Sequence, residues 1–338
     1  MDDLTDFIAA LPKVELHVHQ VGSAPPATVA ALAAKHEGST AVPTDPALLA
    51  QYFTFTDFAH FIEVYLSVVD LIRDPQDVRT LTYDVAAQLA AQQVRYAELT
   101  VTPFTSVRAG IAAPDFCDAI EDARIAAERD LGIVLRWCFD IPGEAGLPAA
   151  DATLDIALRQ APAGLVSFGL GGPEIGVPRA QFAPHFAAAR AAGLHSVPHA
   201  GESTGPATIW SALTDLHAER IGHGISAAQD PALMRHLAEH GISLEISPTS
   251  NVCTRSVPSL AEHPLPVLAA AGVPFTINTD DPPMFSTTLD QEYAVAATLL
   301  GLDRVGVAGL ASAAVAASFA PASVKAEIQR EIETHLTG

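Results

Sequence analysis

The chain has 338 residues, of which 49% are hydrophobic and 17% charged, a composition that supports a buried core and excludes a disordered protein. Its 18 Lys and Arg residues against 39 Asp and Glu residues give a formal net charge of −21. A surface this acidic repels phosphate backbones and anionic lipid headgroups, so no nucleic acid or membrane partner is expected, and a small molecule is the expected ligand.

The sequence favours a cytoplasmic location. Its three cysteines are widely spaced and form no CxxC pair, which predicts a reducing compartment and no disulfide framework. No basic segment followed by an apolar run occurs at the N-terminus, so no signal peptide is expected. The apolar stretch near 294–320 is interrupted by Asp303 and Arg304, which predicts soluble helices in place of a membrane span. Nothing in the sequence indicates an oligomeric state.

Short β-type runs alternate with helical segments along most of the chain. This alternation predicts parallel strands joined by right-handed crossovers, and eight such units predict an α/β fold of the (β/α)8 TIM-barrel type. A doubly wound sheet is the competing topology. The eight expected strands are residues 14–19, 95–103, 135–142, 165–172, 195–202, 220–226, 243–251 and 275–282. The clearest helical segments are residues 115–131, 153–160, 182–192, 207–218 and 231–239.

The gap at approximately residues 20–94 is too long for one crossover and predicts extra helices inserted after the first strand. Four of its residues recur at i, i+3, i+4 and i+7 and give one apolar helix face: Phe58, Phe61, Ile62 and Tyr65. That face either packs into the core or forms an apolar lid over the barrel mouth, where it would contact a substrate. No linker divides the chain, so residues 1–338 are expected to form a single barrel domain carrying this helical insertion.

Polar side chains gather at the expected C-terminal ends of the strands, the face where barrel enzymes hold their active sites. In the first strand His17 and His19 are two residues apart and point to the same face, as ligands of one metal must. The alternative is a pair of hydrogen-bonded histidines at a strand end. His199 and Glu202 end another strand and add a third imidazole and a carboxylate.

Two further positions complete this set of polar residues. His223 lies between two glycines, whose backbone freedom would let a ligand approach closely. Asp280 and Asp281 end a hydrophobic strand, where two carboxylates are costly unless a cation or hydrogen-bond donors meet them. The alternative for His223 is a tight turn with an incidental histidine, and the alternative for Asp280 and Asp281 is a solvated turn with an Asp as helix cap. Because one barrel would place all these groups at one mouth, together they indicate a single metal site.

These residues lie in motifs that resemble the adenosine deaminase family of the amidohydrolase superfamily. The motifs are LPKVELHVH at 11–19, HAGE at 199–202, RIGHG at 220–224, SPTSN at 247–251 and NTDDP at 278–282. The resemblance implies one zinc ion per chain and hydrolytic removal of the 6-amino group of an adenine nucleoside as ammonia. It implies that the zinc ligands are His17, His19, His199 and Asp280.

The resemblance also implies roles for the other residues. Glu202 would protonate the purine at N1, His223 would orient or deprotonate the attacking water, and Asp281 would contact that water and N7. The backbone of Gly172 would donate to N3. An acid that is protonated near neutral pH is needed, and a Glu in a partly apolar pocket meets that need.

The sequence departs from the family where the substrate's 5′ side would bind. Many adenosine deaminases have, two residues after the HxH motif, an Asp that accepts from the 5′-hydroxyl, whereas this chain has Val21. Valine cannot accept a hydrogen bond, so a nucleoside substituted at the 5′ position is favoured. The chain is similar in this to the family branch that deaminates 6-aminodeoxyfutalosine, an adenine nucleoside with a 5′ extension from one menaquinone route. Adenosine, 5′-deoxyadenosine and 5′-methylthioadenosine are the alternative substrates.

A different enzyme class is also compatible with one motif. Residues 201–205, GESTG, match the GxSxG turn of serine hydrolases and are preceded by a strand and followed by a helix, so Ser203 is a candidate nucleophile. That hypothesis leaves the His17 and Asp280 motifs unexplained. Deamination of free adenine is the nearest alternative within the family, although the residue at position 21 counts against it. Iron, cobalt or manganese could replace zinc in a site of this kind.

Overall fold

The computed structural model describes residues 2–338 and contains one sheet of eight parallel strands in sequential order, each hydrogen bonded to the next. The sheet closes on itself through a bridge between Val18 and Asp280, where the Asp280 N–H donates to the His17 carbonyl and the His19 N–H donates to the Asp280 carbonyl, each at 2.9 Å. The predicted barrel is therefore confirmed. Its strands are β1 (Lys13–His19), β2 (Val94–Val101), β3 (Val134–Pro142), β4 (Leu165–Gly171), β5 (His195–Ala200), β6 (Arg220–His223), β7 (Ser243–Ile246) and β8 (Phe275–Ile277).

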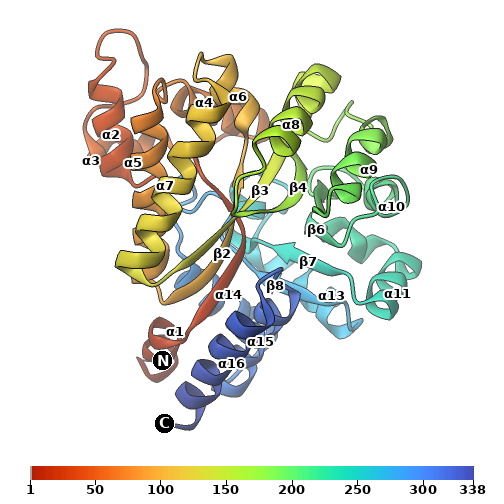
Figure 1. The fold of residues 1–338 in the computed structure, drawn as a ribbon. Coiled ribbons are helices and arrows are strands. Elements are labelled where there is room, and N and C mark those ends of the chain that lie inside the picture. Colours follow the sequence, from red (N-terminus) through yellow and green to blue (C-terminus); the bar gives the residue numbers. More distant parts are fainter. Residues whose placement is uncertain (1) are drawn as a thin grey trace.

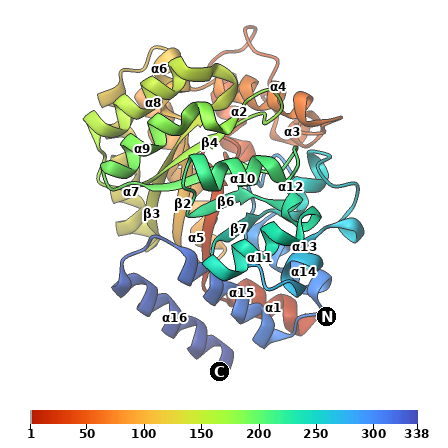
Figure 2. The same cartoon turned by 90° about the vertical axis from the view of Figure 1, so that its right-hand side faces the viewer.

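Helices surround the barrel on all sides (Figure 1). Both chain termini lie at one end of it, beside α1 and α16, whereas α2, α4 and α6 lie at the other end in both views (Figures 1 and 2). The α-helices are α1 (Asp2–Ala10), α2 (Pro26–Ala34), α3 (Pro46–Tyr52), α4 (Phe58–Val69), α5 (Pro75–Ala91), α6 (Pro103–Arg108), α7 (Ala113–Leu131), α8 (Gly146–Gln160), α9 (Ala183–Ala191), α10 (Pro206–Asp215), α11 (Pro231–His240), α12 (Pro248–Cys253), α13 (Leu265–Ala270), α14 (Leu289–Leu300), α15 (Arg304–Ala317) and α16 (Ala322–Thr337). Short 3-10 turns are η1 (Gly143–Ala145), η2 (Arg179–Phe182), η3 (Ile225–Gln229) and η4 (Leu260–Glu262).

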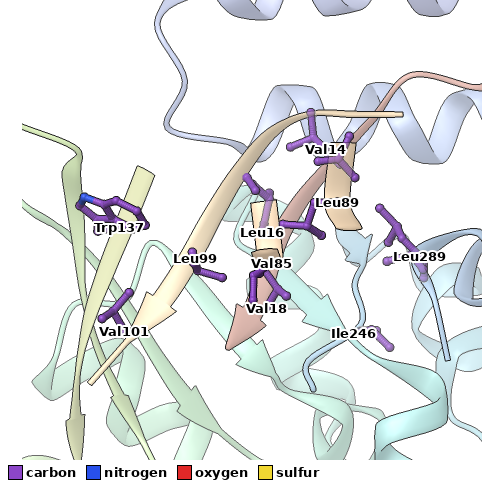
Figure 3. Packing of buried hydrophobic residues seen from close by; sticks show 14 of the residues in the cluster. Val14, Leu16, Val18, Val85, Leu89, Leu99, Val101, Trp137, Ile246 and Leu289 are labelled. Carbon is purple, nitrogen blue, oxygen red and sulfur yellow. The ribbon is translucent and has the colours of Figure 1, made fainter. Parts of the chain in front are cut away.

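The first strand shows how the sequence sorts side chains between the barrel interior and the helices. Val14, Leu16 and Val18 alternate along β1 and are fully or almost fully buried. They point out of the barrel into an apolar layer that includes Val85 and Leu89 of α5 (Figure 3). The intervening residues, His17 among them, therefore point into the barrel, as the period of two in a strand requires.

The expected insertion after β1 contains four helices, α2 to α5. Aspartates cap the starts of three of them. Asp45 accepts from the Ala47 N–H at 2.9 Å at the start of α3, Asp57 from the His60 N–H at 2.9 Å at the start of α4, and Asp74 from the Asp77 N–H at 2.8 Å at the start of α5. Helix α5 leads directly into β2 and packs against α7, so it is the helix of the first barrel unit. The other three are additional.

Six strands end earlier than the sequence predicted: β4 by one residue, β2 and β5 by two, β6 by three, and β7 and β8 by five. The backbone enters the left-handed region at Gly201 (φ 71°), directly after β5, and at His223 (φ 58°), the last residue of β6. Asp280 (φ 67°) is also left-handed; it lies three residues after β8 and pairs with Val18. After β7, Pro248 occupies the first turn of α12, so the prediction of strand up to residue 251 was wrong. The predicted site residues that follow β5, β6 and β8 still lie close to the ends of these strands, because only the position at which regular strand pairing ends differs from the prediction.

Two other expectations concern apolar segments and cysteines. The stretch near 294–320 forms parts of α14 and α15, and in residues 2–338 no helix is long and apolar enough to cross a bilayer. Cys117, Cys138 and Cys253 are all free thiols.

Candidate active site

Residues from four strand ends bring three histidines and an aspartate into one buried cluster. Ligand atoms of His17, His199, His223 and Asp280 all lie within 4.8 Å of one another. Those of His19, Asp280 and Asp281 form an overlapping group of three within the same distance. The four residues predicted as metal ligands are thus brought together, with His223 beside them.

The separations between the predicted ligand atoms fit a tetrahedral metal. His19 Nε2 lies 3.2 Å from His199 Nε2, and Asp280 Oδ1 lies 3.2 Å from His19 Nε2 and 3.4 Å from His17 Nε2. Two atoms bound at about 2.0–2.1 Å to a tetrahedral zinc are roughly 3.3 Å apart. His17 Nε2 is buried and makes no hydrogen bond, which leaves its lone pair for such an ion. The residues present therefore fit a zinc ion.

The electrostatics of the cluster also favour a cation. Burial by itself lowers the pKa of His17, but the adjacent carboxylates of Asp280 and Glu245 raise it to about 10. Burial likewise lowers the pKa of His19, and Asp281 together with Asp280 raises it to about 9. A cluster that draws protons onto buried imidazoles stabilises positive charge, and a bound metal would replace those protons.

Two of the ligands are held by neighbouring side chains that sequence reasoning did not assign. The Glu245 carboxylate accepts from His17 Nδ1 at 2.9 Å, and this fixes the tautomer that leaves Nε2 facing Asp280. The Ser250 hydroxyl donates to Asp280 Oδ2 at 2.6 Å. Glu245 lies in the middle of β7, so only the strand register, which the sequence does not give, could have placed it behind His17.

Glu202 lies two residues after β5 and faces the cluster. Its carboxyl oxygen Oε2 is 3.7 Å from His223 Nε2, and Oε1 accepts weakly from the Thr254 hydroxyl at 3.3 Å. Burial, with the charges of Asp280 and Glu174, raises the pKa of Glu202 to about 8. A carboxyl group in this state holds a proton near neutral pH, as the predicted acid requires.

A chain of hydrogen bonds fixes where His223 carries its proton. The Leu265 N–H donates to Nδ1 of His263 at 3.1 Å, so the proton of the neutral His263 ring is on Nε2. That Nε2 donates to Asn251 Oδ1 at 3.2 Å, and Asn251 Nδ2 donates to His223 Nδ1 at 3.1 Å. Burial lowers the pKa of His223 to about 3 and that of His263 to about 4, so both rings are neutral. The His223 proton is therefore on Nε2, which faces the cluster as a hydrogen-bond donor.

The adjacent aspartates differ in protonation. Burial and the charge of Asp280 raise the pKa of Asp281 well above its usual range. Burial also acts to raise the pKa of Asp280, but the close contacts of its carboxylate with His17 and His19 hold it well below its usual range. Asp281 Oδ1 is buried without a partner, and a side chain on Gly22 would overlap this carboxyl group. The raised pKa favours the protonated form of Asp281, in which the carboxyl group is able to donate to a ligand.

A cavity at the C-terminal ends of the strands is lined by most of the predicted site residues. One wall is apolar and comes from α4 of the insertion. It is lined by Phe58, Ile62 and Tyr65, which are half-buried, and by Phe61, which is buried. The same side chains also pack against the hydrophobic core. This helix face therefore both packs on the core and lines the cavity, while its contact with a substrate stays a prediction. The floor and remaining walls include these predicted residues: Val21, Gly172, His19, His199, Glu202, His223, Asp280 and Asp281.

Another part of the cavity lining is polar and was missed in the sequence. Two acids follow or end β3: buried Asp140, which accepts from the Thr102 hydroxyl at 2.5 Å, and Glu144, whose carboxylate lies against Gly172. Hydroxyl groups from β2 and α6 complete it: Thr100, Thr102, Thr105 and Ser106. Asp140 lies at a strand end like the other polar residues, so the same positional rule could have identified it.

The serine-hydrolase alternative has no geometric support. In residues 2–338 no histidine is hydrogen bonded to the Ser203 hydroxyl, and the Ser203 N–H donates to Glu174 at 3.3 Å. The GxSxG turn instead serves to carry Glu202 into the cluster.

Comparison with known proteins agrees with this geometry. A protein from Streptomyces avermitilis described as an aminodeoxyfutalosine deaminase is 66% identical over 335 residues, which cover 98% of this chain and 93% of that protein. The crystal structure of an adenine deaminase from Arthrobacter aurescens has a TM-score of 0.92 at 29% identity and covers 97% of this chain and 100% of its own. The crystal structure of an amidohydrolase from Burkholderia ambifaria with bound Zn has a TM-score of 0.88 at 26% identity, covering 99% and 95%.

The match extends to the family as a whole. The sequence pattern of the family described as adenosine deaminase matches residues 12–335, nearly the whole chain. The chain belongs to the adenosine deaminase family.

Proposed function

We propose that this protein is a zinc-dependent aminohydrolase that replaces the 6-amino group of an adenine nucleoside by oxygen and releases ammonia, with 6-aminodeoxyfutalosine as its substrate. One observation carries the reaction type: the buried carboxyl of Glu202, protonated near neutral pH, faces the His and Asp cluster at the cavity floor. A proton donor beside a cation site is what addition of water to an electron-rich purine requires.

We assign the metal to His17, His19, His199 and Asp280, whose spacing supports one tetrahedral zinc ion. When bound, zinc lowers the pKa of a coordinated water from about 15.7 to roughly 7 and so supplies a nucleophile at neutral pH. The relative with bound Zn supports this choice of metal.

The other residues hold the purine and move protons. The Glu202 carboxyl donates its proton to N1, which makes C6 electrophilic. The Glu202 carboxylate then takes up a proton from the attacking water and passes it to the leaving amine. The Nε2–H of His223 orients the attacking oxygen, since its hydrogen-bond chain makes it a donor in the resting site. Protonated Asp281 donates to N7, and the Gly172 N–H donates to N3. Water adds at C6, the C6–N bond breaks, and ammonia leaves.

The cavity walls support a nucleoside with a modified 5′ position. Val21 lines the cavity and offers no hydrogen-bond acceptor, and the apolar wall of α4 suits an apolar 5′ extension. Asp140 and Glu144 offer acceptors for sugar hydroxyls, for which free adenine has no use. The 66% identical protein described as an aminodeoxyfutalosine deaminase supports the same substrate.

A carboxylate on the 5′ extension would approach a protein of net charge −21 against its field, so a local cation is needed. Arg108 at the end of α6 is our candidate. It is exposed, it acts on the charge of cavity-lining Glu144, and Thr105 and Ser106 of the same helix line the cavity. Arg108→Gln should raise KM for 6-aminodeoxyfutalosine and leave KM for 5′-deoxyadenosine unchanged.

The test is ammonia release from 6-aminodeoxyfutalosine, 5′-deoxyadenosine, 5′-methylthioadenosine, adenosine and adenine. We expect the highest kcat/KM for 6-aminodeoxyfutalosine. A preference for adenosine would refute the role of Val21, and a preference for adenine, the substrate named for the Arthrobacter aurescens relative, would refute the nucleoside assignment. Glu202→Gln should retain zinc and nearly abolish turnover; full activity would refute its role as the acid.

A further inference from the structure

One buried carboxylate holds the loop that carries Glu202. Glu174, which is 5% exposed, accepts from three consecutive backbone N–H groups of that loop: from Gly201 at 2.9 Å, from Glu202 at 2.7 Å and from Ser203 at 3.3 Å. The Thr204 hydroxyl also donates to it. These donors lie between β5 and α10, outside the ladder and the helix, so Glu174 satisfies groups that regular structure leaves free.

The shape of the loop explains why a carboxylate fits. Gly201 has a left-handed backbone with φ 71°, and successive N–H groups around such a residue point inward to form a concave anion site. A side chain at Gly201 would overlap Ser226 and Ile209, so glycine is required there. The loop is therefore built around an internal anion, and Glu174 is that anion.

A buried cation accompanies this carboxylate. Arg179 in η2 is 1% exposed, and its charge acts on Glu174 and Glu202. Its Nη1 donates to the Val177 carbonyl at 3.2 Å, while Nε and Nη2 are buried without a partner. Such a guanidinium balances the charge of Glu174 without replacing any of its hydrogen bonds, which leaves the carboxylate free to bind the loop.

Glu174 also belongs to the segment that offers the backbone donor of the purine site. It follows Gly172, which lines the cavity, by two residues. The hydrogen bonds that Glu174 accepts from residues 201–204 are called the clamp below. The clamp joins the segment of Gly172, assigned to purine N3, to the loop of Glu202, assigned to N1. Both contacts are made to the six-membered ring of the base, at the nitrogens on either side of C2, so their separation has to be fixed to within a fraction of an ångström for a proton to reach N1.

We propose that Glu174 is a positioning residue for the reaction, which fixes the loop of residues 201–203 so that Glu202 and the Gly172 N–H meet the same purine together. This inference rests on the proposed function, because it assigns Glu174 an effect that passes through Glu202. Loss of the clamp displaces the acid more than it weakens purine binding. It therefore lowers kcat about 10–100-fold, the scale of a misplacement of about 1 Å, and changes KM less than threefold.

The experiment compares Glu174→Gln, Glu202→Gln and the double variant in steady-state ammonia release, with zinc content and thermal midpoint measured for each. Glu174→Gln places an amide NH2 among the loop N–H donors. The matched control is Glu63→Gln, which makes the same change at an exposed position of α4. If Glu174 acts through Glu202, the double variant is no slower than Glu202→Gln alone. Glu174→Asp, which keeps the charge, should recover part of kcat.

Several results would overturn the inference. An equal fold-loss from Glu174→Gln in both backgrounds would show a general structural effect, and an unchanged kcat would show no effect on the acid. Full activity of Glu202→Gln would refute the proposed function itself and this inference with it, an outcome separate from the first two. If Glu174→Gln does not fold, Thr204→Val removes one donor of the same carboxylate and should lower kcat severalfold at unchanged zinc content; unchanged kcat there would also overturn the proposal.

Discussion

Replacing Glu245 by Gln tests whether the proposed metal site depends on the buried charge behind it. Glu245 is 1% exposed; its Oε2 accepts from His17 Nδ1 at 2.9 Å and its Oε1 accepts from Arg220 Nε at 2.6 Å. A glutamine has the same size but only one acceptor oxygen. Whichever way its amide is turned, its NH2 group faces either the His17 donor or the Arg220 donor.

The expected losses follow from burial and from the role of His17. Loss of a carboxylate behind a ligating histidine weakens metal binding about 10–100-fold, or about 1.4–2.7 kcal/mol. Removing one partner of a buried ion pair costs about 3–5 kcal/mol of unfolding free energy, because Arg220 loses one of its two carboxylates. For a chain of 338 residues this corresponds to a fall in Tm of about 4–7 °C.

Zinc affinity is measured by competition with a chelator of known affinity, and Tm by calorimetry of the metal-free protein. Glu219→Gln is the matched control, since Glu219 accepts from His195 Nδ1 at 2.8 Å but the two side chains are 43% and 41% exposed. That control should bind zinc normally and change Tm by less than about 1 °C. Equal zinc affinity in the two variants would refute the reasoning that Glu245 supports a metal ligand.

The remaining predictions concern specificity, tautomer and pH. Val21→Asp should raise kcat/KM for adenosine relative to 5′-deoxyadenosine about tenfold or more, because a carboxylate accepts from the 5′-hydroxyl; an unchanged ratio would exclude Val21 from that position. Asn251→Asp should reverse the bond to Nδ1 of His223, so that Nε2 loses its proton, and should lower kcat about 10²–10⁴-fold with zinc retained; wild-type kcat would contradict the tautomer assignment. Burial, with neighbouring carboxylates, raises the pKa of Glu202 to about 8, and a bound cation lowers it from there. The acid must be protonated, so kcat/KM should fall as pH rises through a midpoint at or below 8, and the lack of such a fall in a pH–rate profile would count against the acid.

Much of the fold could be predicted because its signals are local. The alternation of strands and helices depends on residues close in sequence, and it is enough to predict a barrel and the end at which polar residues meet. The strand ends were less predictable. His223 and Asp280 adopt left-handed backbone conformations that non-glycine residues rarely take, so nothing in their local propensity indicates that β6 ends at His223 or that β8 ends before Asp280.

The parts of the site that the sequence did not reveal are contacts between distant positions. Glu245 meets His17 across 228 residues of sequence, and Glu174 meets Gly201 across 27. His263 meets Asn251 across only 12 residues, but through an irregular segment between α12 and α13. In each case the residue type is compatible with several roles, and only the three-dimensional register selects one.

The barrel interior is more ionic than stability alone would favour, and the site explains why. Well-packed apolar residues commonly stabilise a core as well as a buried ion pair or better. Yet Lys13, Glu15, His17 and His19 all point inward from β1, and the first three are at most 1% exposed. Lys13 donates to the carbonyls of Ile8 and Leu11, and Glu15 accepts from the Thr279 N–H beside Asp280.

A series of contacts between charged side chains runs from His17 in the cluster to the other end of the barrel. His17 is backed by Glu245, Glu245 by Arg220, and Arg220 by Glu98, whose Oε1 accepts from the Phe319 N–H at 2.7 Å. The Arg220 guanidinium lies 4.0 Å from the centre of the Phe319 ring. A carboxylate is needed behind the histidine, a cation behind the carboxylate, and a further anion behind the cation. The charge compensation that begins at one proposed metal ligand therefore continues through the barrel to the segment between α15 and α16.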